Sequence, residues 1–301
     1  MQTRRLASAL GILMMLSFGV PAEQPATIQS ADRTDAEAEA ESADLDQVTV
    51  TARRRREILQ ERINAFVSLI AVPSYTEGMA RWQVALCPLV AGASPGNAAY
   101  IKGRVSQVAT DAGIPLAAKK CPPNFVIILT PEPETLLRDW WAESPRLFNK
   151  DRGVAPIDRF IDTEETVRVW YNACSVPPGS DFVLKGNPDC GIGQLGSKLT
   201  FATVRAIYSV IVVIDFERIK GTNVGQLADY VAMVGLAQIR RDADLLSLPT
   251  ILNLFADGTP VRPQGMTSWD KSFLKSLYAT ESGNVTQISQ IKSEMQRDLV
   301  P

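Results

Sequence analysis

The chain has 301 residues, a formal net charge of −2 at neutral pH and no histidine. Because the chain has no imidazole, it cannot contain Ser-His-Asp or Cys-His catalytic groups, a histidine general base or a histidine-containing metal site. Beyond the first 62 residues the charges nearly balance, which argues against nucleic acid as a partner.

The first 22 residues have the pattern of a secretory signal peptide. Arg4 and Arg5 give a positively charged start, an apolar run from Leu6 to Val20 follows, and cleavage is expected after Ala22. The run is too short to span a bilayer comfortably, and no later segment is long enough. We therefore expect an exported protein, periplasmic or extracellular, that is not transmembrane after cleavage. The alternative is that the run is retained as an anchor helix.

Residues 23–56 are predicted to form a disordered leader. Residues 23–47 contain eight acids and one arginine, with almost nothing to bury. The segment Val48 to Ala52 is rich in β-branched residues and is predicted to be extended. Arg53 to Arg56 follow, and they either contact an anionic partner or pair with the acidic leader.

Residues 57–301 are predicted to form a single α/β domain, with α+β character, in which helices pack on a mixed twisted sheet. Gly113 is a helix stop, and Thr267 with Asp270 forms a capping box. Apolar periodicity predicts the other elements. In chain order they are helix 57–72, strand 82–86, helix 98–112, strand 124–130, helix 134–141, strand 166–173, one or two strands within 198–219, helix 224–239, a helical turn at 250–255, a helix up to residue 278 and a C-terminal helix at 284–300.

Four cysteines remain after export, and an even count in an exported chain favours disulfide bonds. Three connectivities are open. We expect Cys87–Cys121 and Cys174–Cys190, because each of these pairs brackets a local unit and the loops do not cross. A zinc site is the alternative, but no two cysteines have CxxC spacing and no histidine is present.

A polar group lies at and after the strongest predicted strand. Asp215 and Glu217 end that strand, and Gln226, Asp229 and Tyr230 lie on the otherwise apolar helix that follows. One interpretation is a packing helix, in which Gln226 and Asp229 hold the neighbouring loop and the apolar side chains face the sheet. The other is a carboxylate site for a metal-independent hydrolase.

The leader segment "VTVTARRR" resembles the TonB box of outer-membrane receptors, a short extended segment near the mature N-terminus that pairs with an edge strand of TonB. The resemblance implies that a TonB-like partner binds Val48, Thr49, Val50, Thr51 and Ala52 by strand addition. The body departs from that family, because a chain of this length with helices and four cysteines is not a large outer-membrane barrel. The alternative is an edge strand or linker of the chain's own domain.

The last third of the chain resembles the zincin metalloproteases, metzincins in particular. The matching segments are Leu252 to Phe255, Met266 to Asp270 and Leu277-Tyr278. The resemblance implies a zincin-like fold. It also places Gln226 and Tyr230 at the positions of the two zinc-binding histidines of HExxH, and Leu227 at the position of the glutamate base. Since these residues cannot bind a catalytic zinc or take a proton from water, the resemblance implies an inactive relative.

The whole chain is similar to uncharacterised exported proteins of Gram-negative bacteria, in which a "VTVTARRR" leader precedes a cysteine-bearing α/β body. The sequence therefore predicts a disulfide-bonded, non-catalytic exported protein that binds a protein or cell-envelope partner. No metal and no cofactor are expected. The alternative function is the metal-independent hydrolase with a carboxylate cluster.

Overall fold

The computed structural model describes residues 35–74, 78–148, 157–177, 203–259, 261–280 and 286–300; for residues 35–49 and 73–74 it describes the backbone alone. The chain divides into two units, Met1–Thr51 and Ala52–Pro301. The predicted signal peptide and Cys190 lie outside the described residues. No helix in the described ranges combines the length and the apolar character that crossing a membrane requires.

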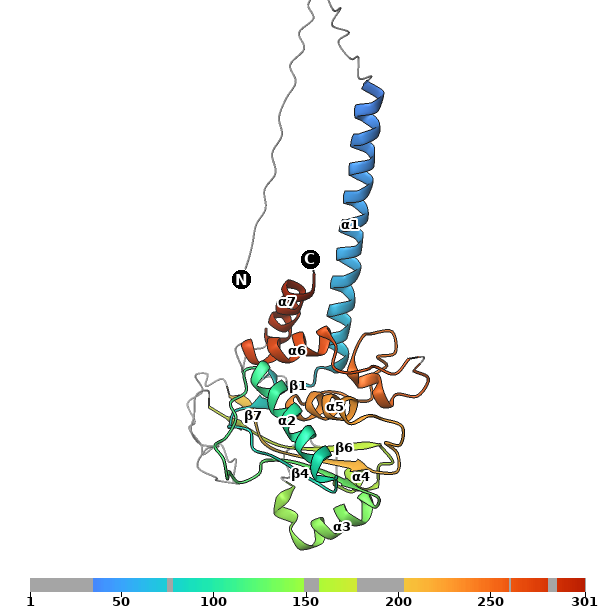
Figure 1. The fold of residues 1–301 in the computed structure, drawn as a ribbon. Coiled ribbons are helices and arrows are strands. Elements are labelled where there is room, and N and C mark those ends of the chain that lie inside the picture. The colour runs from blue at the N-terminus through green and yellow to red at the C-terminus, as the bar shows by residue number, and fades with distance from the viewer. Residues whose placement is uncertain are drawn as a thin grey trace, which may run out of the picture. The chain divides into compact units, whose positions relative to one another are not determined.

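The second unit is built on a five-stranded mixed sheet (Figure 1). Its strands are β3 (Arg81–Trp82), β4 (Pro88–Ala91), β5 (Phe125–Thr130), β6 (Val167–Val176) and β7 (Val204–Asp215). β4, β5 and β7 are parallel neighbours, β3 pairs in parallel with the first part of β7, and β6 is antiparallel to β7. The predicted mixed α/β sheet is therefore confirmed, with one continuous strand at residues 204–215.

Helices cover both faces of this sheet (Figure 1). Alternate residues of β7 point to opposite faces. Val212 and Ile214 belong to the main core, which includes residues of α2 and α5, whereas Ile211 and Val213 belong to a smaller core with residues of α3 and α4. The bounds are α2 (Pro95–Asp111), α3 (Pro133–Glu143), α4 (Ile157–Asp162) and α5 (Val224–Leu236). As predicted, α2 stops before Gly113, whose φ of +90° suits glycine.

On the main-core side the remaining elements are η3 (Ile251–Phe255), α6 (Ser268–Ala279), α7 (Gln287–Leu299) and a small ribbon of β1 (Pro73–Ser74) and β2 (Gly78–Met79). η1 (Pro145–Leu147) follows α3 on the other face and leads to Phe148 in the smaller core. α6 begins with the predicted capping box of Thr267 and Asp270. The fully buried Asp270 also accepts hydrogen bonds from the Thr250 hydroxyl (2.5 Å) and the Ile251 N–H (2.8 Å), which joins η3 to α6. Burial raises the pKa of this carboxyl above its ordinary value.

α1 (Asp35–Ile70) corrects the prediction for residues 35–56. The segment Val48 to Ala52 is helical, not extended, and the helix begins 22 residues earlier than expected. The flanks explain the difference, because the alanine- and glutamate-rich stretch before this segment and the arginines after it are good helix formers. Propagating a helix through four weak formers costs less than starting a new one. Residues 23–34 lie outside the described part of the chain.

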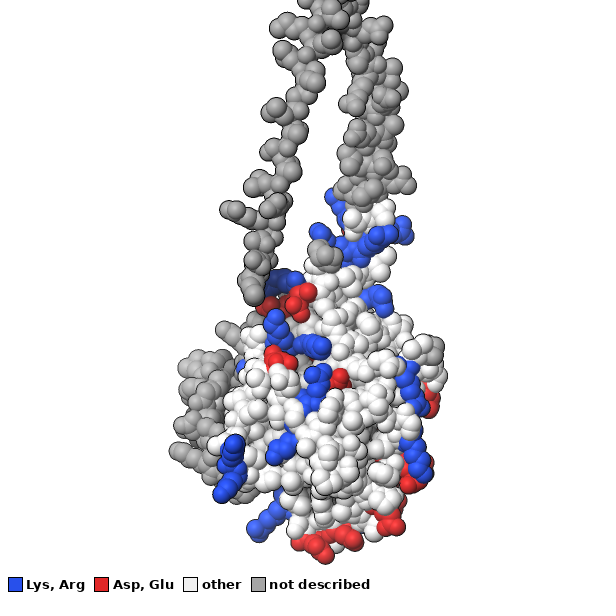
Figure 2. Space-filling view, viewed as in Figure 1, with Lys and Arg blue, Asp and Glu red and all other residues white. Residues whose placement is uncertain are grey.

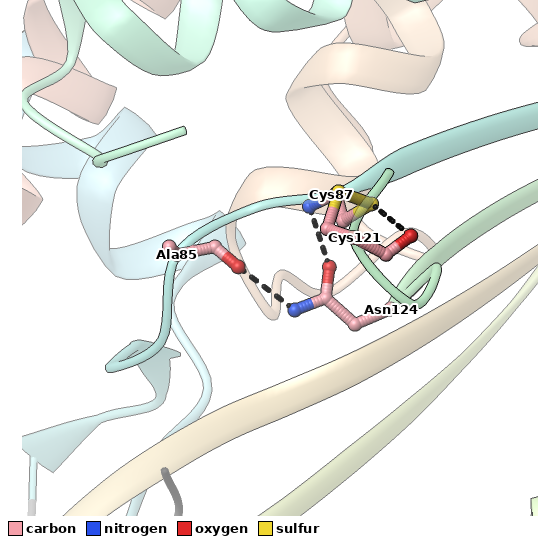
Figure 3. The surroundings of a disulfide bond; sticks show 4 residues. All are labelled: Ala85, Cys87, Cys121 and Asn124. Atoms are coloured by element: carbon pink, nitrogen blue, oxygen red, sulfur yellow. Dashed lines mark hydrogen bonds between the residues drawn. A yellow bond between two sulfur atoms is a disulfide. The ribbon is translucent and has the colours of Figure 1, made fainter. Parts of the chain in front are cut away.

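The predicted disulfide between Cys87 and Cys121 is confirmed (Figure 3). It joins the start of β4 to the segment before β5, 34 residues later. Beside it, the Asn124 side chain accepts a hydrogen bond from the Cys87 N–H (2.7 Å) and donates one to the Ala85 carbonyl (2.9 Å). The disulfide and the amide thus fix the same two chain segments. The second predicted pairing involves Cys190, outside the described residues.

α5 is a core helix, as one of the two interpretations expects. It ends at Leu236, three residues before the predicted end, and its residues from Gln226 to Leu236 are all buried. Gly235 lies against the sheet so closely that a Cβ atom there would be 2.0 Å from the Phe125 ring. The absence of a side chain at this position therefore sets the distance between α5 and β5.

Candidate functional site

Gln226 stabilises the N-terminus of α5. The Asn223 side chain accepts a hydrogen bond from the Gln226 N–H (2.9 Å), and the Gln226 side chain accepts one from the Asn223 N–H (3.1 Å). This reciprocal capping box satisfies two backbone N–H groups that the helix leaves unpaired. The Gln226 amide also donates to the Pro263 carbonyl (2.8 Å), so it holds the loop before α6.

Asp229, one turn further along, is held between α2 and the same loop. The residue is 6% exposed, and its carboxylate accepts hydrogen bonds from the Arg104 Nε (2.5 Å) and the Met266 N–H (2.7 Å). The hydrogen bond to Asp229 raises the pKa of the Arg104 guanidinium. Both hydrogen bonds join α5 to neighbouring segments, as the packing interpretation of this helix expects.

Tyr230 lies on another side of α5 and lines a cleft of about 330 Å³ that we call the Arg241 cleft. The Tyr230 ring packs edge-on against Phe255 of η3, with 4.9 Å between ring centroids. Arg241, in the loop after α5, forms an ion pair with Glu165 and donates a hydrogen bond to the Val167 carbonyl (2.6 Å) at the start of β6. The cleft is therefore bounded by α5, η3, the loop after α5 and the start of β6.

Burial and neighbouring charges shift the pKa values of two side chains in the cleft, Tyr230 and Arg241. Burial raises the pKa of Tyr230, and the nearby Arg241 offsets part of that rise, so the phenol stays protonated. Burial is the largest single influence on the pKa of Arg241 and lowers it, but Glu165, Tyr230 and Tyr171 together outweigh it, so the net shift is upward. The Tyr230 phenol and the Arg241 guanidinium can donate hydrogen bonds to a polar group in the cleft, whose lining also includes carboxylates such as Glu165.

Asp215 and Glu217 form a turn at the end of β7. The Asp215 side chain accepts hydrogen bonds from the N–H groups of Glu217 (2.9 Å) and Arg218 (3.3 Å), and Glu217 forms an ion pair with Lys220. Asp215 also forms an ion pair with Arg218, which lines the Arg241 cleft. The five predicted polar residues thus lie in three places: the turn after β7, the contact of α5 with the loop before α6, and the cleft.

Arg104, Glu165 and Arg241 were not predicted as members of a site. Glu165 and Arg241 are 76 residues apart in the chain, and Arg104 and Asp229 are 125 apart. No local pattern identifies such a pair. The one signal for Arg104 was its place on α2, beside the buried stripe of Ile101, Val105 and Val108.

Residues 48–52, the predicted partner-binding segment, lie within α1. Val50 is 65% exposed, and Thr51 and Ala52 are also exposed. Within the described ranges, no group of three or more Cys, Asp or Glu side chains could hold a metal ion. Comparison of the chain with protein-family models, with curated proteins and with solved structures finds no match in any of the three.

Proposed function

We propose that this chain is a non-catalytic exported protein, periplasmic or extracellular, that binds a protein or cell-envelope partner, and that its body is an inactive relative of the zincin metalloproteases. The observation that carries the proposal is the internal use of every polar side chain on α5. Gln226 caps the helix, Asp229 binds α2 and the loop before α6, and Tyr230 packs against η3. Gln226 and Asp229 are thus satisfied within the protein, and burial raises the pKa of the Tyr230 phenol that lines the Arg241 cleft, so α5 offers no free base for catalysis.

The order of the elements supports the zincin-like part of the proposal. In zincins a sheet ends in an edge strand, the next helix carries HExxH, and a later helix opens with a Trp-Asp pair. Here the antiparallel β6 neighbours β7, β7 leads into α5, and α6 opens with Trp269 and Asp270. The buried Met266 lies just before α6 and is bonded to α5 through Asp229.

The surroundings of α5 distinguish two ways of aligning the HExxH motif with this helix. The resemblance puts Gln226 and Tyr230 at the histidine positions, and Tyr230 lines the Arg241 cleft. A second register, which puts the glycine of HExxHxxGxxH at Gly235, places Ala228 and Ala232 there instead. Both alanines are fully buried in the main core, where no substrate could reach a metal. In the first register only the Tyr230 position lines the cleft, whereas Gln226 is bonded to the loop before α6, and the two positions offer a phenol and an amide.

The alternative, a metal-independent hydrolase, has less support. Carboxylate catalysis needs two groups near one reacting atom. Asp215 and Glu217 bond to their own turn and to Arg218 and Lys220, whereas Asp229 bonds to α2. Each of these carboxylates thus already has a cationic partner, and the hydrogen bonds of the described residues do not link the turn after β7 to Asp229.

Metal analysis of the purified protein tests the zincin part of the proposal. We expect substoichiometric zinc after dialysis against zinc, because the first register supplies no imidazole or thiolate ligand. We also expect no hydrolysis of casein above that of a buffer control, with or without a chelator. An active zincin purified and assayed in parallel is the positive control. One zinc per chain, together with peptide hydrolysis that a chelator abolishes, is the result that excludes an inactive relative.

The proposed partner contact is the segment Val48 to Ala52. Strand addition requires an extended segment, so this part of α1 has to unwind when the partner binds. Valine and threonine are weaker helix formers than alanine by roughly 0.5 kcal/mol each. The segment is accordingly the part of α1 whose helix is least favoured by its own sequence.

Replacing residues 48–51 should abolish capture of a purified TonB periplasmic domain by the full-length protein. A Gly-Ser replacement removes the β-branched side chains, and a four-alanine replacement strengthens the helix, so both should reduce capture at least tenfold. The same Gly-Ser replacement at residues 41–44, within the same helix, is the matched control and should leave capture unchanged. Capture that survives the Gly-Ser replacement at residues 48–51 would exclude this contact.

A further inference from the structure

The charges that line the Arg241 cleft do not balance. Four carboxylates and two guanidiniums line it. Each guanidinium forms an ion pair with one of these carboxylates, and the two pairs are Arg241 with Glu165 and Arg218 with Glu164. Asp242 and Asp257 are exposed, and neither forms a hydrogen bond or ion pair with another described residue. The cleft therefore carries two negative charges that the described residues do not compensate.

This negative excess is a local feature of the cleft. Figure 2 shows basic side chains gathered along the described part of α1, and side chains of both signs on the rest of the visible surface. Beyond residue 62 the charges of the chain nearly balance. The body is therefore not expected to attract cations generally, and a cation that binds it needs a specific site.

Asn253, which also lines the cleft, has an unpaired side-chain oxygen. The residue is 7% exposed, and its amide nitrogen donates hydrogen bonds to the carbonyls of Leu245 (2.8 Å) and Leu248 (2.9 Å). Because only the nitrogen can donate, these two bonds fix which way the amide points. The oxygen accepts no hydrogen bond from a described residue and is not sealed from solvent. A donor inside the cleft would supply the partner that a buried amide oxygen normally has.

The remaining wall of the cleft suits an alkyl chain that carries a cation. It contains the ring pair of Tyr230 and Phe255 and two aliphatic side chains, Leu245 and Leu252. The face of an aromatic ring attracts a cation, and aliphatic side chains pack against methylene groups. The volume of about 330 Å³ is at the lower end of the usual range for ligand pockets. The cleft therefore fits a ligand of roughly the size of one amino acid.

These groups suit an organic cation better than a metal ion. Calcium takes about six to eight oxygen ligands at roughly 2.3–2.6 Å. Within the part of the chain that the structure describes, no three acidic or cysteine side chains lie close enough together to hold a metal ion. Carboxylates on two different segments, an amide oxygen and aromatic rings are instead the usual partners of an ammonium or guanidinium group.

We propose that the Arg241 cleft binds a small organic cation, an alkyl-ammonium or alkyl-guanidinium group. The two unpaired carboxylates and the Asn253 oxygen hold the charged end, and the ring pair of Tyr230 and Phe255 contacts the alkyl stem. A free diamine and a basic side chain of a peptide share this chemistry. All of these side chains belong to the second unit, so the proposal does not depend on the partner segment at residues 48–52.

Isothermal titration calorimetry of the full-length protein tests the charge preference. The probes are cadaverine, a free diamine, and Nα-acetyl-lysine N-methylamide, which represents a basic side chain in a peptide. We expect at least one of them to bind at one site per chain with a dissociation constant of about 1 mM or lower, and the tighter probe identifies the source. Glutarate, a dicarboxylate of the same chain length as cadaverine, is the matched control and should bind at least tenfold more weakly. No binding of either cation at about 10 mM, or glutarate binding as tightly, would overturn the proposal.

Neutralising the two unpaired carboxylates tests the location. The D242N/D257N variant should bind the tighter cation at least tenfold more weakly, because it lacks the charges that hold the cationic end. Both positions are exposed, so the variant should keep the thermal midpoint of the unmodified protein. The matched control, D139N/D158N, makes the same change in net charge at two exposed aspartates that have no partner among the described residues, and its affinity should be unchanged. Affinity that D242N/D257N retains, or that both variants lose equally, would contradict binding in the cleft.

Discussion

Replacing Asp229 with alanine is expected to lower the free energy of unfolding by about 2–4 kcal/mol. The substitution leaves the Met266 N–H without its acceptor and the Arg104 guanidinium without its counter-charge, at a residue that is 6% exposed. Asparagine should cost less, because its carbonyl can still accept from Met266. Urea denaturation of the two variants measures the difference.

A double-mutant cycle separates the ion pair from the rest of this effect. We expect a coupling energy between Arg104 and Asp229 of about 1 kcal/mol, since the two groups are close and Asp229 is buried, while Arg104 is partly exposed. The matched control is the Asp162–Arg138 pair, which joins the same two residue types at 2.6 Å but on the surface. Replacing Asp162 with alanine should leave the unfolding midpoint unchanged within error.

The stability of the D229A variant also tests the hydrolase hypothesis. Catalytic groups are often held in arrangements that cost stability, so removing one is frequently neutral or stabilising. A D229A variant as stable as the unmodified protein would therefore argue against the packing role of α5 and would restore the hydrolase hypothesis. A large loss agrees with a carboxylate that joins α2, α5 and the loop before α6.

Elements whose signal is local were predicted well. The apolar run at residues 125–130 is a central strand, the stop at Gly113 ends α2, and Thr267 with Asp270 caps α6. In each case the residues that determine the structure are within a few positions of each other. The helix predicted at residues 224–239 is likewise present as the buried helix α5, which ends at Leu236.

Two of the failures have different physical causes. For residues 48–52 the local preference for an extended chain was read correctly, but the helix-forming flanks outweigh it. For the site, the missed residues are partners across long stretches of chain. Glu165 meets Arg241, and Arg104 meets Asp229, because β6 and α2 are brought to α5 by the sheet. Such pairings depend on topology, which no short window of sequence contains.

Removing the Cys87–Cys121 disulfide is the second change with a large expected effect. The bond closes a loop of 34 residues, and the loop-closure entropy it removes from the unfolded chain corresponds to about 4 kcal/mol at 25 °C. The double variant C87A/C121A, which leaves no unpaired thiol at this position, should lose about that much free energy of unfolding. Guanidinium denaturation followed by circular dichroism provides the measurement.

An Asn124 variant tests whether the loss of stability comes from the covalent cross-link or from the contacts beside it. Its side chain joins the same two segments through the Cys87 N–H and the Ala85 carbonyl, but it forms no covalent loop (Figure 3). N124A should therefore cost only about 1–3 kcal/mol, the effect of leaving a partly buried group unpaired. If the disulfide acts on the unfolded chain, C87A/C121A should keep a native spectrum and native Asn124 contacts while its midpoint falls. A loss no larger than that of N124A would instead mean that the unfolded chain already holds these segments together, so that the cross-link removes little entropy.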